Sequence, residues 1–448
     1  MIIMKVDLGK GFYGIRAVLQ PVVFDIGLSK ERAEKLKKDF LNELKKVYKD
    51  EEVLEPIVVT SEYEARFLPF IIDRKVDAVV LKAHGRRYIY RRLSWLKLPV
   101  IIWDERGYCH AASWDIRGFL RHWGVEVITP IGPEEHKRVA KVISAVNALK
   151  VSKLIVFGKI PAPNVASQWC LEEIERKLGV IVESIPIDYL LEKAEQVDAE
   201  HLEKTLAGWQ GLFTNFNREV LEEVAKLYLA IKDILEEKKA NAFTINCLED
   251  LFGKKFVPPC IALAKLIDEG IVAGCEADIN VALSMMILSF ISRSPVLMGN
   301  IYLFRPWPGP GFPPSETKIK DIEESLRTNV VRLTHDVIPL TMGIEDKWIL
   351  EDYHNMGKGA TAYVPLKTGT DVTLLRISPD LSEMIAIKGK IMRVEDTIHC
   401  RFSAWIKVRN AREIADNAYA FHHAMVYGDY TRELELFSKL TGIKLKVL

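Results

Sequence analysis

The residues best suited to chemistry begin where a predicted buried strand ends in an acidic turn. Ile271–Gly274 form an apolar run, and Gly-Cys-Glu-Ala-Asp at residues 274–278 leads into an apolar helical stretch, Ile279–Ser292. Asp278 can cap that helix, because its carboxylate can accept from the free N–H groups of the first turn. Glu276 then lies in the strand-to-helix turn, where a carboxylate can bind a hard cation or shuttle protons. The same pattern also fits a solvated loop acid.

Five of the ten histidines fall between residues 335 and 423, and this concentration indicates a site. His335 lies at the end of a predicted strand, whereas His422 and His423 open an apolar run. Neighbouring residues in an extended segment point to opposite sides, so one of the pair can face a site while the other orients it or packs. A capped helix end with satisfied imidazoles fits the pair equally well. Residues 354–359, His-Asn-Met-Gly-Lys-Gly, are glycine-rich and basic, but they lack the spacing of a phosphate-binding loop.

Two other segments could contact ligands. Trp103 ends a predicted strand, and the residues that follow it as far as His110 form a loop suited to a ligand. Residues 84–92 interleave arginine with aromatic residues, a pattern that could bind an anion or nucleic acid. Lys and Arg number 62 against 61 Asp and Glu, which leaves a formal net charge of +1. Because no global field attracts nucleic acid or an anionic membrane, we expect residues 84–92 to form an exposed surface or a subunit contact.

Composition and cysteine spacing predict an ordinary globular protein of the cytoplasm. The six cysteines make no CxxC pair, which argues against a zinc ribbon or a dithiol motif and favours a reducing compartment. We expect no signal peptide, because the opening Met1–Leu8 is too short and leads into Gly-Lys-Gly. The longest apolar stretch, Val281–Ile291, is too short to span a bilayer. We therefore expect no membrane partner.

The elements that must position these residues follow two patterns. Up to about residue 298, β-branched runs alternate with helical stretches, which predicts parallel sheets with ligands at the carboxyl ends of their strands. Beyond Arg305–Pro314, where prolines prevent regular structure, β-like runs are separated by turn signals, which predicts an antiparallel, barrel-like domain. The fold class is therefore α/β, with two Rossmann-like parallel-sheet domains followed by a β-rich C-terminal domain. We place the domains at residues 1–149, 150–298 and 299–448.

The predicted strands define these patterns. In the first part they cover residues 57–60, 78–81, 100–103, 125–129, 154–158, 180–185, 242–246 and 271–274. In the last part they cover residues 330–333, 362–366, 371–377, 383–394 and 398–408, and a helix is predicted over 411–421.

At these residues the chain resembles the L-fucose/L-arabinose isomerase superfamily. The strand, the acidic turn and the apolar helix are similar to the segment in which the family carries a metal-ligating catalytic carboxylate, and the match gives that role to Glu276. Met298–Tyr302 resembles the segment that carries a second acid, and Asn300 stands at the matching catalytic and metal-binding position. His335 resembles a further ligand of the arabinose enzymes, and we expect it to contact the substrate.

The end of the chain resembles the closing motif of the family, in which the second of two residues binds the metal. This match assigns His423 to the ion and leaves His422 to the substrate. Family members are usually trimers or hexamers in which a neighbouring subunit helps to close the pocket. The resemblance therefore implies a homo-oligomer in which the loop with Trp103 and His110 contacts substrate in trans, and we also expect Trp307 to contact the sugar.

The reaction implied by the resemblance interconverts a pentose or deoxyhexose aldose and its ketose through an enediolate. In that reaction the C1 and C2 oxygens of the sugar chelate Mn²⁺, or Co²⁺ or Mg²⁺ in its place, and the ion polarises the carbonyl. Moving a proton from C2 to C1 needs two acid–base groups or one that returns the proton. Asn300 offers an amide oxygen but cannot act as a base near neutral pH. Glu276 could act alone, or another acid such as Asp336 or Glu351 could assist it, or the chain could be a sugar-binding protein that has lost or altered catalysis.

Two other classes of protein fit less well. A sugar clamp of two α/β domains gives no reason for a third domain that carries histidines. A nucleotide-dependent enzyme is disfavoured because no GxGxxG follows an early strand, and Gly9–Gly14 has the wrong spacing.

Overall fold

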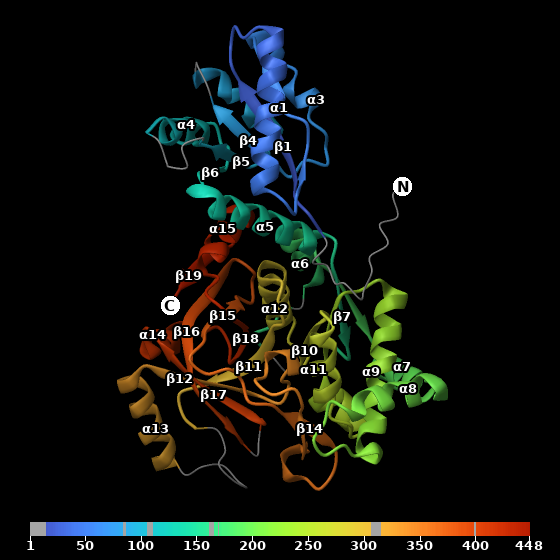
Figure 1. Cartoon of the computed structure of the whole chain (residues 1–448). Coiled ribbons are helices and arrows are strands. Elements are labelled where there is room, and N and C mark those ends of the chain that lie inside the picture. Colours follow the sequence, from blue (N-terminus) through green and yellow to red (C-terminus); the bar gives the residue numbers. More distant parts are fainter. Residues whose placement is uncertain are drawn as a thin grey trace. The chain divides into compact units, whose positions relative to one another are not determined.

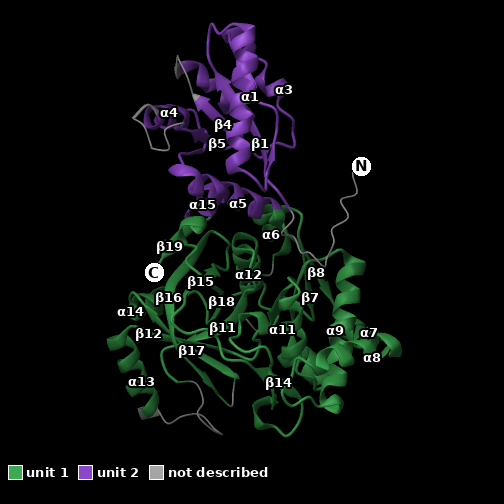
Figure 2. Ribbon diagram, viewed as in Figure 1, with its two compact units in different colours: residues 1–14, 148–434, 443–448 green, residues 15–147, 435–442 purple. Residues whose placement is uncertain are grey.

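The structure is a computed structural model that describes residues 15–83, 87–104, 111–160, 165–168, 170–305, 315–397 and 400–448. The described chain forms two compact units (Figure 2). One unit contains residues 15–147 and 435–442, and the other contains the described residues of 148–434 together with 443–448. His110 and Trp307, two predicted substrate contacts, lie outside the described residues.

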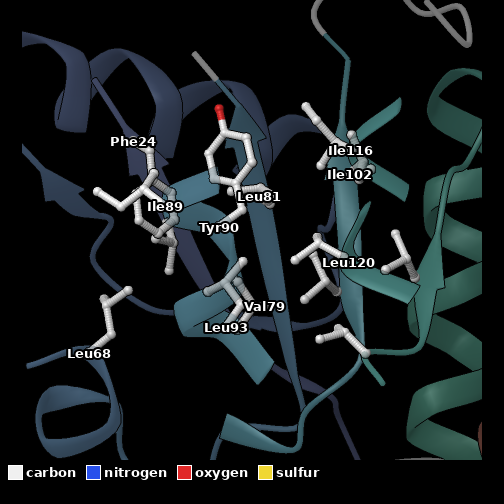
Figure 3. Packing of buried hydrophobic residues seen from close by; sticks show 14 of the residues in the cluster. Phe24, Leu68, Val79, Leu81, Ile89, Tyr90, Leu93, Ile102, Ile116 and Leu120 are labelled. Atoms are coloured by element: carbon white, nitrogen blue, oxygen red, sulfur yellow. The ribbon is translucent and has the colours of Figure 1, made fainter. Parts of the chain in front are cut away.

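The smaller unit is built on a parallel sheet. Its described strands follow the order β2-β1-β4-β5-β6, with β3 also paired to β1. The strands are β1 (Val18–Phe24), β2 (Glu52–Val53), β3 (Ile57–Val59), β4 (Ala78–Ala83), β5 (Val100–Trp103) and β6 (Val127–Ile128). The helices are α1 (Lys30–Val47), α2 (Glu62–Ala65), α3 (Leu68–Ile71), η3 (Arg87–Leu96), α4 (Ala111–His122) and α5 (Gly132–Lys150). Apolar side chains from strands and helices interdigitate on one face of this sheet, with Phe24 packed edge-on against Tyr90 at 5.2 Å between ring centroids (Figure 3).

Strand β1 was not predicted, because Pro21 interrupts its pattern. Pro21 lacks an N–H to donate, so it is tolerated only where the ladder is already broken. That break exists where the partner of β1 changes, since Leu19 pairs with β2 and Val22 begins the pairing with β3. The Gln20 side chain donates to the carbonyl of Glu55 at 2.8 Å and so spans the gap.

The larger unit begins with a second parallel sheet (Figure 1). Its described strands follow the order β10-β9-β7-β8, where β7 is Lys153–Phe157, β8 is Ile181–Ile185, β9 is Ala242–Ile245 and β10 is Val272–Cys275. The helices are α6 (Leu171–Leu178), α7 (Ile187–Glu195), α8 (Ala199–Gln210), α9 (Arg218–Lys238), η4 (Cys247–Leu251), α10 (Phe252–Lys254), α11 (Cys260–Asp268) and α12 (Ile279–Ser292). Every predicted strand of the two parallel sheets has a counterpart within a few residues.

The same unit ends in a closed barrel. Six described strands pair antiparallel in the order β15-β18-β11-β12-β17-β16, and β15 also pairs with β16 to close the ring. These strands are β11 (Leu297–Tyr302), β12 (Val330–His335), β15 (Asp371–Ile377), β16 (Glu383–Asp396), β17 (Phe402–Val408) and β18 (His422–Tyr427). Strand β19 (Lys444–Val447) joins β16 in parallel, and β13 (Ile349–Asp352) pairs with β14 (Ala360–Tyr363). The predicted fold class, two parallel α/β sheets followed by an antiparallel barrel, is confirmed.

The helices of the last part differ from the prediction. Helix α13 (Ser315–Thr328) was not predicted, and α14 (Ala411–Asn417) ends four residues earlier than expected. The remaining helical elements are the short turns η5 (Leu340–Met342) and η6 (Tyr353–Asn355) and helix α15 (Thr431–Thr441). Because α14 stops early, the histidine pair opens strand β18 and does not end a helix. Among the described helices, none is long and apolar enough to cross a membrane.

Candidate active site

The acidic turn holds Glu276 at the carboxyl end of β10. Glu276 and Ala277 have φ values of 57° and 48°, a left-handed conformation that is costly for residues with a Cβ. Hydrogen bonds hold the turn, since Ala277 N donates to Ile245 O at 3.0 Å and Asp278 N donates to Cys275 O at 3.3 Å. The turn thus presents the Glu276 side chain, which is 21% exposed, toward strand β18.

Asp278 connects the turn to the barrel. Its Oδ1 accepts from Val281 N at 3.1 Å, which confirms the predicted N-cap of α12. Its Oδ2 accepts from Arg376 Nη1 at 2.7 Å and lies 2.9 Å from His422 Nδ1. Because a carboxylate at this distance requires a proton on Nδ1, the His422 ring is held with Nε2 pointing away from Asp278. That Nε2 lies 3.5 Å from Glu276 Oε2.

His335 completes a compact group with Glu276 and His422. One ligand atom from each of these three residues lies within 4.8 Å of the other two. The His335 and His422 rings are 6.4 Å apart between centroids. Val337 N donates to His335 Nδ1 at 3.2 Å, so a neutral His335 carries its proton on Nε2 and can donate from it.

Asn300 lies beside this group, in the middle of β11. It pairs with His422 of β18 on one side and with Thr334 of β12 on the other, and paired residues share a face of the sheet. Its Nδ2 donates to Tyr302 Oη at 3.3 Å. Its Oδ1 is buried and has no hydrogen-bond partner within the described part of the chain. A buried, unpaired amide oxygen is costly unless a ligand or an ion binds it.

His423 does not join the group. Successive residues of a strand point to opposite faces, so His423 turns away from Glu276 when His422 faces it. Its Nδ1 lies 3.3 Å from Phe421 O, and burial, with the nearby Arg376 charge, lowers the pKa of His423 to about 3. The structure therefore brings His422, and not His423, to the place where the resemblance put a metal ligand.

Charges within the group favour an ionised Glu276. Burial opposes ionisation, but the hydrogen bond and charge of His422, with the charge of His335, lower the Glu276 pKa. Burial likewise opposes a charged His422, but its bonds to Asp278 and Glu276 raise the pKa of that imidazole. His335 differs, because its burial outweighs the neighbouring carboxylates and lowers its pKa. A proton on His422 Nε2, which faces the Glu276 carboxylate, occupies a place that a divalent cation could take.

Sequence reasoning missed two residues of this site. Arg376 is fully buried against Asp278, and its only signal was a lone arginine within the apolar run of a predicted strand. Tyr302 follows Asn300 by two residues and therefore lies on the same face of β11. Burial first, and then the charges of Cys400 and Glu276, raise the Tyr302 pKa. The strand periodicity could have identified Tyr302.

Trp103 lies in the smaller unit, at the end of β5. Its ring contacts Phe40 at 6.0 Å, Tyr48 at 6.1 Å and His136 at 4.6 Å between centroids. Its indole N–H has no hydrogen-bond partner within the residues that the structure describes. Within this unit Trp103 is therefore part of an aromatic cluster.

The donor set suits a divalent cation. Glu276 offers a carboxylate, Asn300 an unpaired amide oxygen and His422 an imidazole Nε2 that lies 3.5 Å from Glu276 Oε2. Mixed oxygen and imidazole ligands suit Mn²⁺, Co²⁺ or Mg²⁺. The Asp278 carboxylate behind His422 is the kind of partner that orients metal-bound histidines.

Comparisons with known proteins show similarity to sugar isomerases. Residues 172–294, which include the acidic turn, match the L-arabinose isomerase central domain family. The sulfoquinovose isomerase of Priestia aryabhattai is 24% identical over 434 residues, covering 88% of this chain and 90% of that protein. The sulfoquinovose isomerase of Alkalicoccus urumqiensis is 23% identical over 68% of this chain and 66% of its own length. The L-arabinose isomerase of Thermotoga sp. (strain RQ2) is 24% identical over 39% of this chain and 35% of its own length.

Proposed function

Because the chain belongs to the superfamily of the L-arabinose and L-fucose isomerases, we propose that it is a metal-dependent aldose–ketose isomerase. The observation that carries this proposal is the convergence of Glu276, His335 and His422 within 4.8 Å. Three polar side chains from three distant segments meet at the carboxyl end of a parallel sheet, where α/β proteins bind their ligands.

We assign the ion to Glu276, Asn300 and His422. This assignment exchanges the two neighbouring histidines relative to the expectation from resemblance, because His422 faces Glu276 and His423 does not. When bound, Mn²⁺ or a similar ion would polarise the sugar carbonyl and stabilise negative charge on the adjacent oxygen. The unpaired Oδ1 of Asn300 fits a hard cation as a neutral ligand.

Glu276 carries the proton in this proposal. Its lowered pKa keeps the carboxylate ionised near neutral pH, so it can remove the proton from C2 and return it to C1 through an enediolate. Asn300 cannot share this task, because an amide does not titrate in this range. His335, with its proton on Nε2, can donate to a sugar oxygen, and Tyr302 can supply a hydroxyl on the same side.

The substrate is proposed as a pentose or a deoxyhexose. The relatives that cover most of the chain are named for sulfoquinovose, itself a 6-deoxyhexose that carries a sulfonate, and the shorter matches are named for L-arabinose. A substrate panel therefore needs sulfoquinovose, L-fucose and L-arabinose as its first members.

The test is proton exchange at C2 in D₂O, followed by NMR with Mn²⁺ present. We expect one aldose of the panel to gain deuterium at C2 and to form its ketose. Glu276→Gln should lower the rate by at least about 100-fold, because one positioned acid–base group typically contributes that much. Glu175→Gln, a change on the exposed face of α6, serves as the matched control and should leave the rate unchanged.

Sugar binding without any exchange would contradict the isomerase proposal. That result would favour the alternative, a sugar-binding protein of the isomerase fold in which Asn300 has replaced a needed acid. Near-normal exchange in Glu276→Gln would remove Glu276 from the proton path.

A further inference from the structure

A second group of side chains that could hold a metal ion lies beside the candidate active site. Asp336 follows β12 directly, His354 lies in the turn η6, and Cys400 lies in the connection between β16 and β17. One ligand atom from each residue lies within 4.8 Å of the other two. The sequence had singled out the segment that begins at His354, and the proposed isomerase reaction gives it no role.

Asp336 carries a buried charge in this group. It is 7% exposed, and no lysine or arginine side chain within the described residues pairs with it. The nearby guanidinium of Arg401 instead pairs with Asp396 at 2.6 Å. Asp336 Oδ1 accepts from Arg401 N at 2.9 Å, which orients Oδ2 toward His354 Nε2 at 2.8 Å. Such a carboxylate is suited to a cation as its counter-charge.

His354 Nε2 faces two groups with opposite requirements. The Asp336 carboxylate at 2.8 Å accepts a proton, whereas the Cys400 N–H at 3.4 Å requires a lone pair. A single nitrogen that carries one proton cannot satisfy both. The ring itself is held flat against Tyr353, with centroids 4.0 Å apart and an interplanar angle of 10°. His354 is thus fixed in place, with Nε2 directed at the centre of the group.

The backbone at two of these residues is held in an uncommon conformation. His354 and Cys400 have φ values of 51° and 61°, in the left-handed region that residues with a Cβ rarely adopt. Thr397 Oγ1 donates to the carbonyl of Cys400 and so holds that turn. Three separate segments therefore converge with defined side-chain directions.

We propose that Asp336, His354 and Cys400 bind a second divalent cation of the Zn²⁺ or Co²⁺ class. A thiolate, an imidazole and a carboxylate form a mixed donor set that favours these borderline ions over Mg²⁺ or Mn²⁺. Binding releases the thiol proton of Cys400 to solvent as the Cys400 sulfur–metal bond forms. Three protein ligands leave the fourth corner of a tetrahedron to water.

The geometry needs only a small contraction. Metal–sulfur and metal–nitrogen bonds of about 2.3 and 2.0 Å place neighbouring ligand atoms roughly 3.5 Å apart in a tetrahedron. The present atoms lie within 4.8 Å, so side-chain rotation of about 1 Å would close the site. The ion would cross-link the end of β12 to two connections of the barrel, immediately after His335.

Cobalt distinguishes this site from the one at Glu276, because only a thiolate gives an intense sulfur-to-cobalt charge-transfer band in the near ultraviolet. The full chain is stripped with a chelator, titrated with Co²⁺ and followed by absorption, with bound metal counted after gel filtration. We expect the band in the unmodified protein, with at least one Co²⁺ per chain. Cys400→Ser should abolish the band and remove one Co²⁺, and His354→Gln should weaken binding at the same site at least 10-fold.

Control variants separate this proposal from the isomerase proposal, on which it does not depend. Glu276→Gln should keep the band, because that residue belongs to the other group, and Cys260→Ser should keep it, because this neighbouring thiol is not a ligand. Circular dichroism identifies the variants that fold. If Cys400→Ser does not fold, the loss of Co²⁺ binding in His354→Gln tests the proposal in its place. A missing band in the unmodified protein, or a band that persists in folded Cys400→Ser, would overturn the second metal site.

Discussion

Asp278 is the residue on which the site geometry depends most. One carboxylate caps α12, pairs with the buried Arg376 and holds His422 by its Nδ1–H. The sequence predicted the cap, because an acid before an apolar helix is a local pattern. It could not predict the other two contacts, since Arg376 and His422 are 98 and 144 positions away in the chain.

The histidine pair also shows that local sequence patterns do not predict contacts between distant segments. Strand alternation predicted that one member would face a site and the other would not. Which member faced it depended on the register between β18 and β11, where Asn300 opposes His422. Resemblance pointed to His423, and the ladder brings His422 to Glu276 instead.

Asp278→Asn tests whether this carboxylate orients a metal ligand. An asparagine can still cap the helix, but it cannot hold the His422 tautomer as strongly and leaves Arg376 buried without a counter-charge. We expect the Mn²⁺ dissociation constant from calorimetry to rise about 10- to 100-fold. Asp380→Asn, in the turn between β15 and β16, is the matched control. An unchanged affinity in Asp278→Asn would show that His422 is not held for a metal.

The arrangement of strands explains why the acidic turn at Glu276 lies next to the segments that carry His335 and His422. Glu276 lies at the carboxyl end of a parallel strand, which the alternation of strands and helices predicted. The meeting of β11, β12 and β18 brings Asn300, His335 and His422 together, and this order of strands in the barrel cannot be read from periodicity alone. Of these strands the periodicity predicted β12 and missed β11. Periodicity also carries no information on which distant strands pair.

Gly299 tests the dependence of the site on the contact between β11 and β12. A Cβ at this position would lie 2.8 Å from Leu333 Cγ and 3.0 Å from Thr334 O, so Gly299→Ala must push the strands apart. We expect a loss of about 1–3 kcal/mol in stability and a clear loss of Mn²⁺ affinity, because Asn300 and His335 move with their strands.

Gly389→Ala is the matched control for this change. A Cβ there would lie 2.3 Å from Ile406 Cγ2, but Gly389 pairs with Val408, at the far end of β17 from the partner of His335. It should lower the unfolding temperature while keeping Mn²⁺ affinity. Equal losses of affinity in both variants would mean that general destabilisation, and not the position of Asn300, sets metal binding.

The whole molecule consists of two units, each with its own core. Periodicity predicted both parallel sheets and a barrel-like last part. It missed β1, where Pro21 interrupts the strand at the change of partner, and it missed β11 of the barrel. The division at residues 149 and 298, the homo-oligomeric state and the roles of His110 and Trp307 stay predictions. They depend on contacts between segments or subunits that local sequence patterns do not encode.

The smaller unit should lose stability in acid through His136. Burial lowers the pKa of His136 from 6.5 to about 4, and Tyr48 Oη lies 2.7 Å from its Nδ1. In the unfolded chain this imidazole takes up a proton as the pH falls through 6.5, whereas in the folded chain it stays neutral down to about pH 4. Protonation therefore favours the unfolded chain, and the stability that is present above pH 6.5 is lost as the pH falls toward 4. The loss should reach about 3 kcal/mol.

His136→Gln should flatten this part of the pH dependence, as measured by thermal unfolding in the presence of a chelator. His201→Gln is the matched control, because the His201 side chain is 76% exposed. If the unfolding temperature of His136→Gln falls as steeply between pH 6.5 and 4 as that of the unmodified chain, another group causes the acid sensitivity.

The central claim is that the acidic turn and the first histidine of β18 share one divalent cation. Crystals soaked in Mn²⁺ and measured at the manganese absorption edge locate that ion by its anomalous signal. We predict a peak in bonding contact with the Glu276 carboxylate and His422 Nε2, with Asn300 Oδ1 facing it. A manganese peak bound to His423, or one that contacts neither Glu276 nor His422, would contradict the account.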